Sequence, residues 1–301
     1  MKSAVAARNE ATIDFRTKFA DYLELTKPRI AVLVLFTVAA GFLLASRGTV
    51  DIVLMMHTLL ATALIAAGSS ALNQYLERET DQHMHRTENR PLPTGRMSSV
   101  ESVCFGIALG VAGLVYMSLV VRQPLAVIIA AVTFLLYVWV YTPLKKVTTM
   151  NTLVGAVPGA LPPLIGWAAA SSTISADGWA LFFLLFLWQI PHFLGIAWIY
   201  REDYARAGLR MLPVVDPTGR ATGRQMILYT LALIAVSASP FLTGAVGITY
   251  LLCVMTTGLY FLITTIQFAR QPSKVTAKGV VRASILYLPV LLLVLVLCSY
   301  F

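Results

Sequence analysis

The sequence predicts an all-α, polytopic membrane protein with about nine transmembrane helices. Three observations support this fold class. The 301 residues are 58% hydrophobic and only 12% charged, a balance too apolar for an ordinary soluble domain. Apolar runs of about 20 residues, the length of one bilayer crossing, recur along the chain. Almost all Lys and Arg residues fall on one side of these runs, as in membrane proteins of fixed orientation.

A polar N-terminal segment precedes the expected spans. Residues 1–26 mix both charge signs with aromatic residues, which is typical of an amphipathic segment on the membrane surface; a frayed tail is the alternative. We expect this segment to be cytoplasmic and residues 27–301 to form one transmembrane domain. Pro158, Pro162 and Pro163 are expected to bend or break the fifth span. The expected spans are residues 28–46, 52–76, 99–121, 124–142, 151–171, 179–200, 225–244, 246–269 and 280–300.

The basic residues predict the orientation of the chain. Of the 23 Lys and Arg residues, all but Arg47 and Arg122 fall on one side of the expected spans. Positive loops stay in the cytoplasm, so the N-terminus is expected there and the C-terminus on the opposite side. The net charge of +9 therefore indicates orientation in a lipid bilayer and not a nucleic-acid partner. We expect a multi-pass protein of a bacterial inner membrane, although a mitochondrial inner membrane fits the same physics.

A polar run at the end of the second expected span carries the predicted chemistry. Asn73, Glu77 and Asp81 recur every four residues, so a continuous helix places their oxygens on roughly one side. Such oxygens suit Mg²⁺, which binds one or two carboxylates together with substrate phosphates. Arg86 and Arg90 follow, and guanidinium groups suit phosphate oxygens. The run predicts a diphosphate site; the alternative is an interfacial cap whose arginines only set topology.

A second acidic cluster follows the sixth expected span. Glu202 and Asp203 lie there between Arg201 and Tyr204. Carboxylates near hydrocarbon are costly unless they are paired, and Mg²⁺ or Arg are natural partners. Because the loops after spans two, four and six share one membrane face, we expect them to build one site. Half of the 14 acidic residues lie in the first and third of these loops: Glu77, Glu79, Asp81, Glu88, Glu202, Asp203 and Asp216.

The order of residues around both clusters resembles a known family, the UbiA-type intramembrane prenyltransferase superfamily. Within it, the chain resembles the branch of protohaem IX farnesyltransferases, or haem O synthases. Glu77 stands where the superfamily has Asp, which keeps the carboxylate, and Ile199 stands where many members have a further acid. The first matching motif is Asn73-x3-Glu77-x3-Asp81-x2-Met84-x-Arg86-Thr87-x2-Arg90-Pro91-Leu92. The second comprises Trp188-Gln-Ile-Pro191-His192-Phe193, Arg201-Glu202-Asp203-Tyr204 and Met211-Leu212-Pro213-Val214.

The resemblance implies the reaction and the roles of the matching residues. A farnesyl group would pass from farnesyl diphosphate to a vinyl group of protohaem IX, with addition of water, giving haem O and diphosphate. A central cavity that opens to the cytoplasmic side would exclude water from the allylic cation. The catalytic residues would be Asn73, Glu77, Asp81, Arg86, Arg90, Lys146, Glu202 and Asp203. The Mg²⁺ ligands would be Asn73, Glu77, Asp81 and Asp203, and the substrate-binding residues Thr87, Lys145, His192, Tyr204 and Arg201.

Two of these assignments have equally plain alternatives. Lys145 and Lys146 resemble the family's basic loop after span four and would contact diphosphate as point charges; a cytoplasmic stop signal explains them equally well. His192 lies about two and a half turns into the sixth span from its cytoplasmic end, where a lone polar ring is costly without a role. It would coordinate or orient haem, or else hydrogen-bond a neighbouring helix.

Other functions remain to be weighed against this one. A prenyltransferase of the same superfamily could use an aromatic acceptor such as hydroxybenzoate. A membrane transporter is less favoured, because the charged groups gather at one membrane face and transport sites usually lie at the midplane. A haem-binding assembly protein would bind haem without using farnesyl diphosphate. The resemblance also makes a haem A synthase or a terminal-oxidase assembly a partner to test.

Overall fold

The computed structural model describes residues 16–46 and 48–300, and within them the regular structure is helical. Nine of the described helices are long and apolar enough to cross a membrane, which confirms the predicted fold class. They are α2 (Pro28–Ser46), α3 (Ile52–Asp81), α4 with η1 (Ser99–Val121), α5 with η2 and α6 (Pro124–Leu144), α7 with α8 (Asn151–Ser171), α9 (Ala176–Ile199), α12 with α13 (Arg220–Leu242), α14 (Ile248–Arg270) and α15 (Lys274–Tyr300).

Several of these spans are composite. Two contain π-helical segments, and short helices follow α9. The component bounds are α4 Ser99–Tyr116, η1 Met117–Val121, α5 Pro124–Leu135, η2 Leu136–Tyr141, α6 Thr142–Leu144, α7 Asn151–Ala160, α8 Pro162–Ser171, α10 Arg201–Arg206, α11 Leu212–Val215, α12 Arg220–Ser237 and α13 Ser239–Leu242. Residues 16–26 are also helical, whereas residues 1–15 and Arg47, on which the topology prediction also relied, lie outside the described residues.

The break predicted in the fifth span is present. α7 ends at Ala160 and α8 begins at Pro162, with Leu161 between them. Proline has no N–H to donate and its ring collides with the preceding turn, so consecutive prolines interrupt the helix. The second half, α8, packs closely on α2: a Cβ built on Gly41 would lie 2.0 Å from the carbonyl oxygen of Pro163. Glycine at this position therefore permits backbone contact between the two helices.

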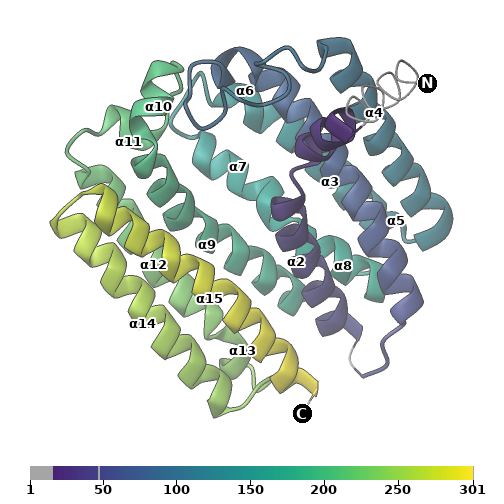
Figure 1. The fold of residues 1–301 in the computed structure, drawn as a ribbon. Helices are drawn as coiled ribbons and strands as arrows, with labels where there is room; N and C mark the ends of the chain where they lie inside the picture. Colours follow the sequence, from purple (N-terminus) through teal and green to yellow (C-terminus); the bar gives the residue numbers. More distant parts are fainter. Residues whose placement is uncertain (1–15, 47, 301) are drawn as a thin grey trace, which may run out of the picture.

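The helices pack around two apolar cores. Figure 1 shows α3, α4 and α5 on one side, α12, α14 and α15 on the other, and α2, α7, α8 and α9 between them. One core joins α9 to α12, α14 and α15 through fully buried residues that include Tyr250, Phe261 and Tyr287. The other joins α2, α3, α5 and α8 and includes Phe42 and Ile165. The polar segments are thereby left to the ends of the bundle.

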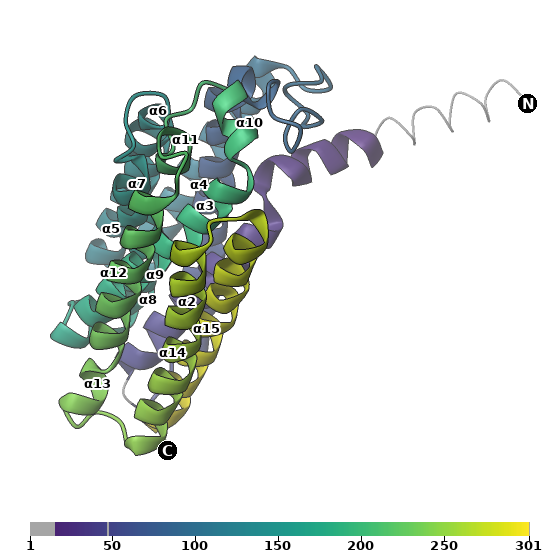
Figure 2. The same ribbon diagram turned by 90° about the vertical axis from the view of Figure 1, so that its left-hand side faces the viewer.

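One end of the bundle collects the polar connections. Figure 2 shows α6, α10 and α11 together at that end, with the helix of residues 16–26 beside them and the end of α15 at the opposite end. The predicted juxtaposition of the loops after spans two, four and six is therefore present. The loop of residues 82–98 belongs to the same end, because it directly follows α3. Which membrane face this end occupies stays a prediction from the basic residues.

Candidate active site

The site is built on the last two turns of α3, which runs farther than the expected span. Hydropathy ends that span at residue 76, but α3 continues to Asp81. Two polar side chains of this region are buried against protein: Asn73, one turn before the extension, is 1% exposed, and Asp81, at its end, is fully buried. The helix persists because these groups find partners inside the protein, which removes most of the cost of burying them.

Each member of the ladder formed by Asn73, Glu77 and Asp81 is paired with a cation from a different part of the chain. Lys27 Nζ donates to Asn73 Oδ1 over 2.6 Å. Lys145 Nζ donates to Glu77 Oε1 over 2.6 Å, and Arg90 Nη1 donates to Asp81 Oδ2 over 2.7 Å. Four residues per step places the three oxygen-bearing groups on one face of α3. The structure thus brings three cations and three oxygen donors into one row.

The amide of Asn73 is oriented by its neighbours. Its Nδ2 donates to the Thr142 hydroxyl over 3.0 Å, and that hydroxyl donates to the carbonyl oxygen of Tyr137 over 2.8 Å. The hydroxyl proton is used on the carbonyl, so Thr142 accepts from the amide nitrogen and leaves Oδ1 of Asn73 facing Lys27. The fourth span therefore fixes an acceptor oxygen of the ladder.

Lys27 is a site residue that the sequence analysis missed. It stands between the helix of residues 16–26 and α2, with a left-handed φ of 49° that is uncommon for a lysine. This turn directs the ammonium group to Asn73. Burial, reinforced by the positive charge of Arg90, lowers the pKa of Lys27 to about 7. Its only sequence signal was the Thr26-Lys27-Pro28-Arg29 stretch, which we had interpreted as a helix start.

The structure separates the two lysines of the loop after α6. Lys145 pairs with Glu77, lies 4.5 Å from the centroid of the Tyr141 ring and has a side chain only 16% exposed. Burial lowers the pKa of Lys145, but the Glu77 carboxylate outweighs it and holds that pKa well above the usual value. Lys146 is exposed, and its side chain has no hydrogen bond or ion pair within residues 16–46 and 48–300. The ladder therefore uses Lys145.

This difference makes a prediction about the two adjacent lysines. Lys145→Met is expected to lower the turnover of the diphosphate substrate that the sequence predicts about 100-fold, because it removes a preorganised cation from the site. Lys146→Met, the matched control, is expected to change it less than about threefold, since an exposed charge is screened by solvent. The measurement is steady-state turnover of both variants at equal amounts of folded protein. Equal losses would assign the two lysines the same role and contradict the arrangement.

The loop of residues 82–98 packs over the end of α3. Thr87 is buried, and its hydroxyl donates to the carbonyl oxygen of Asp81 over 3.1 Å. Met84 is buried in a small apolar cluster with Ala197 of α9 and with Leu209 and Met211. Thr87 thus holds the loop, and Met84 joins it to the segment after α9.

Arg86 connects the first loop with the second acidic cluster. Its guanidinium carbon lies 4.9 Å from the ring centroid of Tyr200 and 5.8 Å from that of Tyr204, and Nη2 donates to the Tyr204 hydroxyl over 3.3 Å. Arg206 Nη1 lies 2.9 Å from Nε2 of His85. The loops after α3 and α9 are therefore in direct contact, as the sequence analysis expected.

The acids of the second cluster are paired with cations of their own. Lys274 Nζ lies 3.2 Å from Glu202, whose side chain is 67% exposed. Asp203 pairs with Arg206. The guanidinium of Arg201 lies 4.5 Å from the centroid of the Trp198 ring. α10 has no fully buried residue. Glu202 lies at the outer rim of the polar end, whereas the Asp203 side chain is only 13% exposed.

A buried oxygen of the ladder lacks a hydrogen-bond partner. Oδ1 of Asp81 is buried and has no hydrogen-bond partner among the described residues. An unpaired carboxylate oxygen in such a place is costly unless a cation completes it. Across residues 16–46 and 48–300, no group of three or more His, Cys, Asp and Glu side chains gathers as a metal site. Glu77, Asp81 and Asn73 offer two carboxylates and one amide, oxygen donors of the kind that Mg²⁺ prefers.

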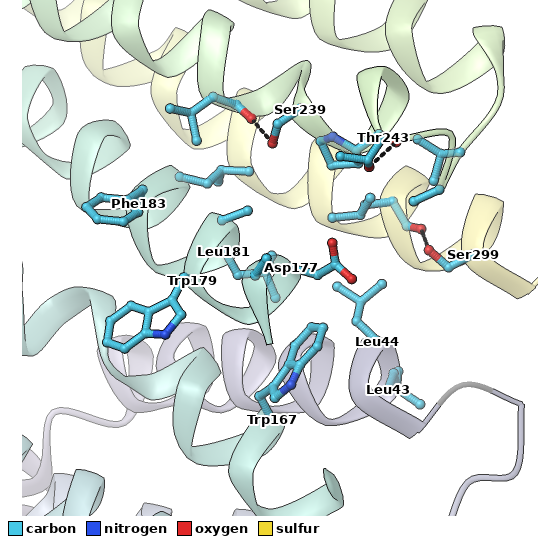
Figure 3. A pocket seen from close by; sticks show the side chains of 18 of the residues that line it. Leu43, Leu44, Trp167, Asp177, Trp179, Leu181, Phe183, Ser239, Thr243 and Ser299 are labelled. Carbon is cyan, nitrogen blue, oxygen red and sulfur yellow. Dashed lines mark hydrogen bonds between the residues drawn. The ribbon is translucent and has the colours of Figure 1, made fainter. Parts of the chain in front are cut away.

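A large cavity lies at the other end of the bundle. It has a volume of about 990 Å³ and mainly apolar walls. Figure 3 shows Trp167, Trp179, Phe183 and Leu44 around it, together with Asp177. These residues come from the ends of α2, α8 and α9 that are remote from the ladder, so this cavity is not the diphosphate site. A central cavity that opens beside the ladder stays a prediction.

The fold and the ladder define a class of protein, a helical intramembrane enzyme with a polar site at one end of its bundle. The chain belongs to the UbiA prenyltransferase family, whose sequence pattern matches residues 34–298. It is 47% identical over 280 residues to the protoheme IX farnesyltransferase of Solibacter usitatus (strain Ellin6076), covering 90% of this chain and 96% of that protein. The protoheme IX farnesyltransferase of Salinibacter ruber (strain DSM 13855 / M31) is 46% identical over 273 residues, covering 89% and 95%.

Solved structures share the fold at lower identity. A UbiA homologue from Archaeoglobus fulgidus bound to GPP and Mg²⁺ superposes with a TM-score of 0.65 at 18% identity, covering 92% of this chain and 99% of that one. A digeranylgeranylglyceryl phosphate synthase superposes with a TM-score of 0.78 at 21% identity, covering 94% and 99%. The described part of the chain therefore shares its overall fold with these structures.

Proposed function

We propose that this protein transfers a farnesyl group from farnesyl diphosphate to a vinyl group of protohaem IX, with addition of water, giving haem O and diphosphate. The observation that carries the proposal is the ladder of Asn73, Glu77 and Asp81, each paired with one cation; together they form the row of oxygens and cations called the row below. Relatives that bear the name protoheme IX farnesyltransferase supply the acceptor and the donor chain.

The three cations of the row bind the diphosphate. Lys27, Lys145 and Arg90 are held in place by the oxygens of α3, and phosphate oxygens compete for the same donors. When the diphosphate departs with the electron pair of the broken C–O bond, its charge grows, and cations already in place stabilise it without reorganisation. Arg86 from the first loop, with Lys146, Arg201, Tyr204, Glu202 and Asp203 at the rim, completes the polar end in this proposal.

The oxygen donors of the row fit a magnesium ion. Asn73, Glu77 and Asp81 would hold it, and the unpaired Oδ1 of Asp81 is the position that a cation would complete. Asp203 would serve as a further ligand from the second cluster. Bound there, Mg²⁺ supplies additional stabilisation of negative charge on the leaving diphosphate. Lys27, Lys145 and Arg90, which lie next to these ligands, would contact the phosphate oxygens.

The apolar interior of the helix bundle protects the farnesyl cation from water. Loss of diphosphate leaves an allylic cation, and the electrons of a vinyl group form the new carbon–carbon bond with it. Water then adds to the inner vinyl carbon and a proton is released, which balances the reaction. Apolar walls keep water from the farnesyl cation before the carbon–carbon bond forms.

Metal removal tests this account of the row. Turnover is expected to fall to background when EDTA is added to the detergent-purified protein, and to return when Mg²⁺ is supplied in excess, because the ion that would stabilise charge on the leaving diphosphate is removed. The assay is release of diphosphate together with prenylated product. Unchanged turnover in EDTA would contradict a metal role for the row.

Acceptor competition tests the assignment of the substrate. The protein is given farnesyl diphosphate, Mg²⁺, protohaem and hydroxybenzoate in one incubation, and both acceptors are extracted and weighed by mass spectrometry. Farnesylated haem without farnesylated aromatic acid is the expected result. A prenylated aromatic acid with unmodified haem would replace the proposed acceptor and leave the prenyltransferase class unchanged.

The proposal includes a location and a recipient. The polar end faces the cytoplasm of a bacterial inner membrane, with residues 1–26 on that side and the end of α15 on the other, because positive loops stay inside. Haem O with its farnesyl tail stays in the bilayer, so a haem A synthase or a terminal-oxidase assembly in the same membrane is the proposed recipient.

A further inference from the structure

His192 is held rigidly between two transmembrane helices. It lies on α9, and its ring stacks on that of Trp188 with centroids 4.9 Å apart and planes inclined by 16°. Its Nδ1 lies 2.7 Å from the hydroxyl oxygen of Ser284 on α15. Trp188 Nε1 donates to the carbonyl oxygen of Ser284 over 2.8 Å. One residue of α15 therefore holds both rings.

The contacts of Ser284 determine which imidazole nitrogen carries the proton. The Ser284 hydroxyl has one proton, and it donates that proton to the carbonyl oxygen of Val281 over 2.7 Å. The same oxygen can then only accept from His192, so Nδ1 of the imidazole is the N–H. Nε2 consequently carries the lone pair, and within the described part of the chain it has no hydrogen-bond partner.

This arrangement is that of a histidine prepared to bind a metal. Histidines that bind metals donate their other ring N–H to an oxygen, which fixes the tautomer and the ring orientation. Haem iron is commonly held by such a nitrogen. His192 precedes the end of α9 at Ile199 by seven residues, or roughly 10 Å of helix. A porphyrin bound there would lie in the apolar bundle below the polar end, where the farnesyl chain must meet it.

The other three histidines do not offer the same geometry. His57 binds the Tyr116 hydroxyl over 2.7 Å near the start of α3, at the end of the bundle remote from the ladder. His83 is exposed and binds the carbonyl oxygen of Glu79. His85 is exposed and contacts Arg206. His192 alone of the four combines an N–H held by Ser284, an Nε2 without a hydrogen-bond partner among the described residues, and a position on α9 near the polar end.

We propose that Nε2 of His192 is the axial ligand of the iron of bound protohaem, with Ser284 and Trp188 as the residues that orient it. The inference rests on the proposed function, because it takes protohaem as the acceptor. Through this bond the iron anchors the porphyrin, and the imidazole donates electron density to it. That density supports the positive charge that develops on the vinyl carbon next to the ring.

Haem titration of the detergent-purified full chain tests the proposal without turnover. The probes are haemin and metal-free protoporphyrin IX, and the readouts are affinity and the Soret band. His192→Ala is expected to weaken haemin binding on the order of 100-fold and to shift the band, and Ser284→Ala to weaken it about tenfold. Both are expected to bind metal-free protoporphyrin as the wild type does, because it offers no iron. His57→Ala is the matched control and is expected to match the wild type with both probes.

Addition of imidazole separates a ligand from a packing residue. In His192→Gly, free imidazole is expected to restore the wild-type Soret band, because it occupies the vacated space and binds the iron. An unchanged haemin spectrum in folded His192→Ala would overturn the proposal, as would equal weakening of haemin and metal-free protoporphyrin. If the wild type converts haem while His192→Ala keeps the wild-type spectrum, only the axial ligand is wrong. If the wild type neither binds nor converts haem, the proposed function itself is wrong.

Discussion

Asp81→Ala is expected to abolish turnover while the protein remains inserted in the membrane. Asp81 is fully buried, binds Arg90 through Oδ2 and presents an unpaired Oδ1. The alanine removes a metal ligand and the partner that positions Arg90, so a loss on the order of 1,000-fold in turnover is expected. Steady-state product formation measures it, and size-exclusion chromatography in detergent reports whether the protein is folded.

Two further variants keep this prediction decisive. Removing one partner of a buried ion pair is itself destabilising, so Asp81→Asn, which keeps the shape of the side chain, provides a folded test of the lost charge. Glu79→Ala is the matched control, because the Glu79 side chain is 69% exposed and its one ion pair among the described residues is with Arg78. Glu79→Ala is expected to retain turnover within about twofold. Full activity of folded Asp81→Asn would remove Asp81 from the site.

Lys27→Met is expected to lower turnover about 100-fold, because it removes a cation that already faces the row. The methionine retains the length and the apolar stem of the lysine, so the backbone turn and the packing are largely kept. The ammonium is held 2.6 Å from Asn73 Oδ1, and the loss is expected to appear partly as a raised KM for farnesyl diphosphate. The measurement is turnover across a range of diphosphate concentrations.

A neighbouring arginine supplies the control for Lys27. Arg29 lies two residues farther along and is exposed, so Arg29→Met removes the same charge from the same stretch without touching the row. It is expected to leave the KM for farnesyl diphosphate within about twofold. If Arg29→Met and Lys27→Met have the same effect, the basic stretch acts only on topology, and the assignment of Lys27 to the site is wrong.

The bundle could be predicted from sequence because its signals are local. A run of about 20 apolar residues is long enough to cross a bilayer wherever it occurs, and consecutive prolines interrupt any helix. The spacing of Asn73, Glu77 and Asp81 likewise predicts a shared face without knowledge of neighbours. The contact between the loops after α3 and α9 followed from the even number of spans between them.

The contacts of the site could not be predicted because they join residues far apart in the chain. Lys27 and Asn73 are separated by 46 positions, and Glu77 and Lys145 by 68. Hydropathy placed the end of the second span at residue 76, because it assigns each polar side chain the cost of an unpaired group. The partners cancel much of that cost, and α3 therefore continues to Asp81.

Adjacent residues of equal charge are a second feature whose roles could not be predicted from the sequence. Lys145 and Lys146 are indistinguishable in composition, but one is held against Glu77 and the other is exposed. The choice depends on the turn that follows α6, where the Lys145 carbonyl oxygen also accepts from the backbone N–H of Arg210 over 2.8 Å. Only the arrangement of these distant segments decides which ammonium enters the site. The same holds for Ser284, which carries no motif and still determines the tautomer of His192.

The mass of the haem recovered after incubation tests the central claim most directly. Detergent-purified protein is incubated with protohaem, farnesyl diphosphate and Mg²⁺, and the extracted haems are separated by liquid chromatography and weighed. The account predicts a product heavier than protohaem by one farnesyl group and one water molecule. Recovery of unmodified protohaem alone, from protein shown to be folded and supplied with all three components, would contradict it.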